Sequence, residues 1–172
     1  MMNILNMPNR SKNFIFIPFC LECQAAQAQK ICKYSWKSSI PPIMQFLIDN
    51  DVNIIQMPCP EWKYKGLIRN SAGLKTYDTE DFNNICEQLA EQTSQQIEEI
   101  IAAKYRILGI LGIEMSPSCA VNYIYTNKGM KHRKGIFFEH LEKKTNKYKI
   151  NFIGINRRNI KKTINVLTNI MK

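Results

Sequence analysis

The sequence predicts an α/β fold: a mostly parallel sheet of about four strands with helices on both faces, arranged as a Rossmann-like three-layer sandwich. Two observations support this prediction. Short apolar runs rich in β-branched and aromatic residues recur along the 172-residue chain, and segments with helical periodicity separate them. Strands that alternate with helices usually pair in parallel and are covered on both faces. Because no repeat, linker or low-complexity tract interrupts this order, we expect a single domain over residues 1–172.

The strands and helices are predicted in strict alternation. Pro41-Pro42 suits the first turn of a helix that ends at Asp49-Asn50-Asp51. Thr79 suits the N-cap of a long helix whose apolar face begins at Phe82, and two shorter helices are expected over residues 136–144 and 160–171. The predicted strands are Phe14–Phe19, Val52–Met57, Ile107–Ile113 and Lys149–Ile155.

The net charge of +10 is concentrated in the last quarter of the chain. Residues 1–126 hold eleven Lys and Arg against twelve Asp and Glu, whereas residues 127–172 hold thirteen against two. A basic surface of this kind suits contacts with phosphates, so tRNA is one candidate partner. The alternative is that these charges simply solvate helix faces. The aromatic side chains available near this region for base stacking are Tyr123, Tyr125, Phe137 and Phe138.

No apolar run, residues 107–113 included, is long enough to cross a membrane. Residues 1–13 also lack the apolar core and cleavage site of a secretory signal. We therefore expect a cytoplasmic protein with no membrane partner. In that reducing compartment, six cysteines are more typical of free thiols or metal ligands than of disulfides.

Three cysteines come after the ends of predicted strands: Cys20 follows the first strand, Cys59 follows the second, and Cys119 lies just beyond the third. The carboxyl ends of parallel strands meet at one edge of a sheet, so these thiols are expected to lie near one another. Thiolates are ligands for zinc and for iron–sulfur clusters, and three ligands would leave one coordination position for water or substrate. Taken singly, each cysteine could equally be a small core residue.

Polar residues accompany these cysteines. Glu61 follows Pro58-Cys59-Pro60 and is a candidate proton carrier, although it could be an exposed loop carboxylate. The hydroxyls of Ser116 and Ser118 could hydrogen-bond cluster sulfurs or substrate, or could cap the following turn.

The remaining cysteines have weaker signals. Cys86 lies on the apolar face of the long predicted helix, which favours a core position. Cys23 forms a C-x-x-C pair with Cys20 and could be a redox partner or a further ligand, and Cys32 has no clear role. His132 and His140 lie in the basic region far from any cysteine and are expected at the surface.

The chain resembles the thiouracil desulfidase (TudS) family, and within it a shorter TudS-related branch of desulfidases. The resemblance covers about residues 13–155. Beyond the first-strand cysteine, it rests on Met57-Pro58-Cys59-Pro60-Glu61 followed by Gly66-Leu67-Ile68-Arg69, on Gly112-Ile113-Glu114-Met115-Ser116-Pro117-Ser118-Cys119, and on Lys134-Gly135-Ile136-Phe137-Phe138.

The resemblance implies an oxygen-sensitive [4Fe–4S] cluster held by three cysteines, matching Cys20, Cys59 and Cys119. It further implies that the fourth iron has no protein ligand and binds the sulfur of a small thiolated substrate such as thiouracil. Water would then replace that sulfur by oxygen, with Glu61, Ser116 or Ser118 positioning the water or carrying its proton.

This chain departs from the family at three places. Ala120 follows the last cysteine where the family usually has glycine, and Met115 stands where the branch has glycine. Either side chain could reshape the substrate pocket. Cys23 lies where the branch has an Asn-containing stretch, and as a fourth ligand it would favour a sulfur-trafficking or redox role over desulfidation.

Overall fold

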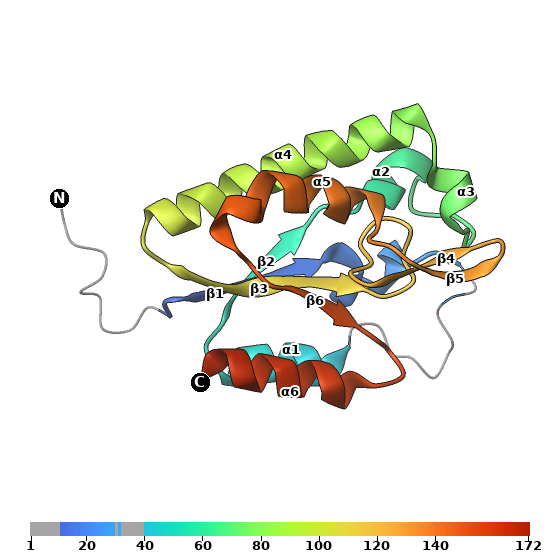
Figure 1. Cartoon of the computed structure of the whole chain (residues 1–172). Helices are drawn as coiled ribbons and strands as arrows, with labels where there is room; N and C mark the ends of the chain where they lie inside the picture. Colours follow the sequence, from blue (N-terminus) through green and yellow to red (C-terminus); the bar gives the residue numbers. More distant parts are fainter. Residues whose placement is uncertain (1–10, 30, 32–39) are drawn as a thin grey trace.

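The structure, a computed structural model, describes residues 11–29, 31 and 40–172 (Figure 1), and it confirms the α/β fold. Its central sheet is parallel throughout, with strand order β2-β1-β3-β6. Cys32 lies outside the described residues, as do residues 1–10. The strands are β1 (Asn13–Pro18), β2 (Asn53–Met57), β3 (Arg106–Ile113) and β6 (Phe152–Ile155).

Helices cover both faces of this sheet, as the sequence predicts (Figure 1). Helices α4 (Glu80–Ala102) and α5 (Ile136–Thr145) lie on one face, and α1 (Pro41–Asp49) and α6 (Ile160–Met171) lie on the other. Successive side chains of a strand point to opposite faces. Accordingly, Phe16 packs into the core on the α4 and α5 side, whereas its neighbours Ile15 and Ile17 pack into the core on the α1 and α6 side.

The predicted boundaries agree closely with the structure except in the last strand. Thr79 caps α4 as expected, because its hydroxyl accepts a hydrogen bond from the Phe82 backbone N–H at 3.3 Å. The last strand begins at Phe152 rather than Lys149. Lys149 instead closes the 3-10 turn η4 (Asn146–Tyr148) with a left-handed φ of 52°, which cannot continue a strand.

Several short elements were not predicted from the sequence. An antiparallel hairpin pairs β4 (Tyr123–Thr126) with β5 (Gly129–His132). Residues that separate a strand from the next long helix also form short helical turns. These turns are η2 (Phe19–Leu21), η3 (Gln24–Ala26), α2 (Pro60–Lys65) and α3 (Leu74–Tyr77).

Some of the lysines in the basic last quarter of the chain form ion pairs with the helix α4. Lys144 pairs with Glu91 at 2.7 Å and Lys147 with Glu98 at 3.0 Å, and both carboxylates belong to α4. Phe137 and Phe138 are buried in the core, so the expectation that they could stack on bases is wrong. Of the helices in the described ranges, none combines the length and apolar character needed to cross a membrane.

Candidate functional site

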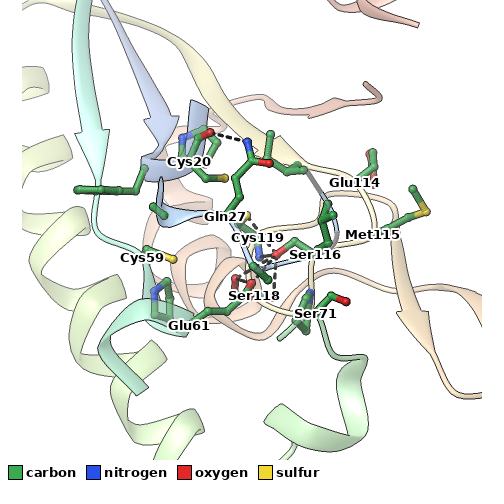
Figure 2. A pocket seen from close by; sticks show the side chains of 18 of the residues that line it. Cys20, Gln27, Cys59, Glu61, Ser71, Glu114, Met115, Ser116, Ser118 and Cys119 are labelled. Atoms are coloured by element: carbon green, nitrogen blue, oxygen red, sulfur yellow. Dashed lines mark hydrogen bonds between the residues drawn. The ribbon is translucent and has the colours of Figure 1, made fainter. Parts of the chain in front are cut away.

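The three strand-end cysteines line one cavity at the carboxyl edge of the sheet. Cys20 lies in η2 directly after β1, Cys59 is the N-cap residue of α2 after β2, and Cys119 follows the turn after β3. All three contribute to a cavity of about 420 Å³. Figure 2 shows their sulfur atoms facing this shared space. The predicted convergence at one edge of the sheet is therefore confirmed.

Glu61 is held by the turn that carries Cys119. Pro60 starts α2, and Glu61 in its first turn points toward Ser116 and Ser118 (Figure 2). The Glu61 Oε1 atom accepts hydrogen bonds from the hydroxyls of Ser118 at 2.7 Å and Ser116 at 3.0 Å. Ser116 Oγ also accepts from the backbone N–H groups of Ser118 and Cys119, each at 3.2 Å. Ser116 therefore caps the turn, which is one of the two roles considered for these serines. Hydrogen bonding to cluster sulfurs or substrate stays a prediction.

Each of the three thiols is shifted toward its protonated form. Burial is the main cause that raises the pKa of Cys59 to about 12, and the negative charge of Glu61 adds to it. Burial also raises the pKa of Cys20 well above its ordinary value, with further contributions from Cys119 and Cys59. The pKa of Cys119 is raised by burial as well, and a hydrogen bond with Ser116 opposes the shift. The charge of Cys119 thus contributes to the raised pKa of both Cys20 and Cys59, as expected of thiols that line one cavity.

Arg69 is a member of the site that the sequence analysis did not assign. Its side chain is only 4% exposed, and its Nη2 group donates to the Ala26 carbonyl at 2.6 Å. Nη2 also lies 3.8 Å from the Cys59 sulfur, and Nε lies 3.6 Å from Glu61 Oε2. The only sequence signal was its position in Gly66-Leu67-Ile68-Arg69, eight residues after Glu61. Nothing in that spacing indicates that its side chain returns to Cys59.

A glycine lets helix α5 approach the Cys119 turn. A Cβ atom on Gly135 would overlap the Ser118 carbonyl group and would lie 2.6 Å from the Cys119 backbone nitrogen. The Gly135 N–H donates to the Ala120 carbonyl at 2.9 Å, and the Ile136 N–H donates to the Pro117 carbonyl at 3.0 Å. The start of α5 is thus packed directly onto the Ser-Pro-Ser-Cys turn, which holds Cys119 in place.

The two departures from glycine have different structural consequences. Met115 has a left-handed φ of 69°, lines the cavity and is 40% exposed. It therefore reshapes the cavity wall, in a conformation that favours glycine. Ala120 is fully buried in the core, and it is not among the residues that line the cavity.

The remaining candidate residues lie away from the cavity lining. Cys23 is half-buried at the start of η3 and does not line the cavity. Cys86 is fully buried in the core, as predicted. His140 hydrogen-bonds Asn83 Oδ1 at 3.0 Å, and burial lowers its pKa. His132 stacks edge-on against Tyr123 in the hairpin.

The three thiols that line the cavity are the donors available there for a soft metal centre. Within residues 11–29, 31 and 40–172, no three His, Cys, Asp or Glu side chains are grouped closely enough to hold a single metal ion. An iron–sulfur cluster distributes its thiolate ligands over several iron atoms, so they need not meet at one point. Cys20, Cys59 and Cys119 are three thiols that line a common cavity, and thiolates are the ligand type that such clusters use.

The fold and site together define an α/β protein with a thiol-lined cavity at the carboxyl edge of its parallel sheet. A similar protein is an uncharacterized protein of Methanocaldococcus jannaschii, which is 32% identical over 101 residues. The match covers 59% of this chain and 61% of the length of that protein. No family model matches the chain, and no solved structure matches it.

Proposed function

We propose that this protein is an iron–sulfur-dependent desulfidase that hydrolyses a thiocarbonyl compound such as thiouracil or a thiouridine. The observation that carries the proposal is the grouping of Cys20, Cys59 and Cys119 around one cavity with the Glu61 carboxylate beside them. The resemblance of the three motifs to the thiouracil desulfidase family supports the same conclusion. The proposal places the protein in the cytoplasm, where thiols stay reduced.

In this proposal Cys20, Cys59 and Cys119 would hold a [4Fe–4S] cluster. A bound cluster would supply a soft Lewis acid that favours the sulfur of the substrate. The overall reaction is redox-neutral: a water molecule and a C=S group give a C=O group and hydrogen sulfide. The electron pairs of the broken C–S bonds leave with the sulfur.

The chain's own residues would prepare the water for attack. Two hydroxyl donors already occupy Glu61 Oε1, whereas Oε2 accepts no hydrogen bond from the described residues and lies 3.6 Å from Arg69. Oε2 is therefore the oxygen available to take a proton from water. Ser116 and Ser118 would keep the carboxylate oriented, and the apolar lining of Phe19, Met57 and Ile113 would limit competing water.

The experiment that tests the proposal begins with anaerobic purification and reconstitution with iron and sulfide. We expect a brown protein with absorbance at roughly 400 nm, as for thiolate-bound iron–sulfur clusters, and release of sulfide from 2-thiouracil or 4-thiouracil. Cys59→Ser should lose the cluster, whereas Cys86→Ala should keep it, because Cys86 is a core residue. A protein that stays colourless after anaerobic reconstitution would refute the proposal.

Cys23→Ser separates the desulfidase from a sulfur-trafficking or redox protein with a fourth thiolate. Cys23 does not line the cavity, so this variant should keep its full cluster content and its activity. Loss of either would favour the trafficking role.

A second candidate, in which the thiolated substrate belongs to tRNA, is favoured by the β4–β5 hairpin. Tyr125 is 54% exposed and lines the cavity, so one aromatic ring lies at its mouth. Tyr123 and Met130 are exposed on the same hairpin, which also carries Lys131. If this is an RNA contact, retention of tRNA should weaken steeply with salt and should drop in Tyr125→Ala. Failure to retain tRNA at low salt would exclude it.

A further inference from the structure

Arg69 is unusual in this protein because it is charged and buried. It is the only Lys, Arg, Asp or Glu classed as buried within the described ranges, at 6% exposure. Burying a guanidinium is costly unless its charge and its N–H groups find partners. Among the described residues, its Nε and Nη1 groups have no hydrogen-bond partner. A residue that is only structural would be expected to be better satisfied.

The contacts that Arg69 does make connect two separate cysteine segments. One segment follows β1, where the Ala26 carbonyl accepts a hydrogen bond from Nη2 and the Gln27 side chain donates to the Cys20 carbonyl at 3.1 Å. The other follows β2, where Nη2 lies 3.8 Å from the Cys59 sulfur and Nε faces Glu61. The backbone reinforces the connection, because the Gln29 N–H donates to the Arg69 carbonyl at 2.8 Å.

The charge of Arg69 is also placed where negative charge would accumulate in the proposed centre. Glu61 Oε2 provides a partner at 3.6 Å, beyond normal hydrogen-bond length. A thiolate at Cys59 would add a second negative partner next to Nη2. Positive charge and hydrogen bonds near ligand sulfurs are among the factors that set the reduction potential of an iron–sulfur cluster.

We propose that Arg69 is the positioning residue of this site, joining the Cys20 segment to the Cys59 turn and supplying the counter-charge for a metal centre held by thiolates. The counter-charge role rests on the proposed function, whereas the joining role does not. Arg69 orients Cys59 and Glu61 and compensates their charge, and it does so through Nη2 and Nε.

The joining role is tested on metal-free protein by hydrogen–deuterium exchange of residues 19–29. Arg69→Met removes the hydrogen bond from the guanidinium to the Ala26 carbonyl. Because hydrogen bonds from charged groups are strong, the backbone amides of residues 19–29 should then exchange about tenfold faster or more. Arg133→Met is the matched control, because Arg133 forms a two-point ion pair with Glu139 outside the cavity. It should leave exchange in residues 19–29 unchanged. Unchanged exchange in a folded Arg69→Met protein would overturn the joining role.

The counter-charge role is tested on reconstituted protein by the midpoint potential of the cluster. Arg69→Met should shift the potential to a more negative value, because reduction then adds charge without a nearby cation. Arg69→Lys keeps the charge but not the planar fork. It should stay near the wild-type potential while residues 19–29 exchange faster. A potential that is the same in both variants and in the wild type would overturn this role.

The outcomes separate this inference from the proposed function. If wild-type protein takes up no iron and sulfide, the proposed function fails, and the exchange experiment still decides the joining role. If Arg69→Met does not fold, the exchange experiment on Arg69→Lys tests the joining role instead. Exchange rates of residues 19–29 in Arg69→Lys equal to those of the wild type would then overturn that role. If the wild type carries a cluster but the variants behave as it does, the inference fails and the proposed function stands.

Discussion

Met115 has a backbone conformation that is unfavourable for any residue with a side chain. We therefore expect glycine to be more stabilising than alanine at this position. Its φ of 69° lies in the left-handed region, where a Cβ atom costs roughly 1–2 kcal/mol. Glycine avoids that cost but loses roughly 0.5–1 kcal/mol more conformational entropy on folding than alanine. The difference predicts that Met115→Gly is more stable than Met115→Ala by about 1 kcal/mol. At an ordinary position the same comparison has the opposite sign.

Alanine is the necessary reference, because Met115 is 40% exposed and therefore buries part of its side chain against the cavity wall. Both variants lose that burial equally, so their difference isolates the backbone. In a chain of this length, about 1 kcal/mol corresponds to a melting temperature roughly 2–4 °C higher for the glycine variant. Urea unfolding of metal-free, reduced protein would measure the same difference directly.

The same comparison of glycine and alanine variants can be made independently at Lys149. It has a φ of 52°, is exposed, and lies at the end of η4 rather than in the cavity lining. Lys149→Gly should likewise exceed Lys149→Ala in stability. If the glycine variant is the less stable one at Met115, the reasoning from backbone strain is refuted there. If the glycine variant is the less stable one at both positions, the cost of a Cβ atom at left-handed φ is smaller than the conformational entropy that glycine loses on folding.

Three further predictions concern the site. Ser118→Ala should lower the free energy of unfolding by about 1.5–3 kcal/mol, because it removes a buried hydroxyl that donates to Glu61 at 2.7 Å. Chemical denaturation measures this change, and a value near zero would contradict the prediction. Gly135→Ala should cost about 1–3 kcal/mol or more, because its methyl group would overlap the Ser118 carbonyl; a thermal melt at the wild-type temperature would contradict the packing. Cluster assembly should improve with rising pH, because only deprotonated cysteines bind iron. The pKa of Cys59 is raised to about 12 and that of Cys20 is raised as well, so both thiols are protonated near neutral pH. Protons are then released on loading, so iron content after reconstitution should fall from pH about 8.5 to about 6.5, and a flat profile would contradict protonated thiols.

Periodicity and turn chemistry were enough to predict the layered architecture. The apolar runs at Phe14–Phe19 and Ile107–Ile113 lie within one residue of the observed strands, because strands buried on both faces need continuous apolar residues. Thr79 was identifiable as a cap because its hydroxyl acts within three residues of its own position. The β4–β5 hairpin was missed because its exposed tyrosines lack the apolar continuity that identifies a buried strand.

What the sequence by itself determined is the α/β fold and the convergence of Cys20, Cys59 and Cys119. Both follow from one rule: parallel strands place their carboxyl ends at one edge of the sheet. Only the tertiary structure decided which polar groups share that edge. Ser118 reaches Glu61 across 57 positions of the chain, and Arg69 reaches Ala26 across 43. Such contacts depend on how separate loops pack together, and no local pattern of residues encodes them.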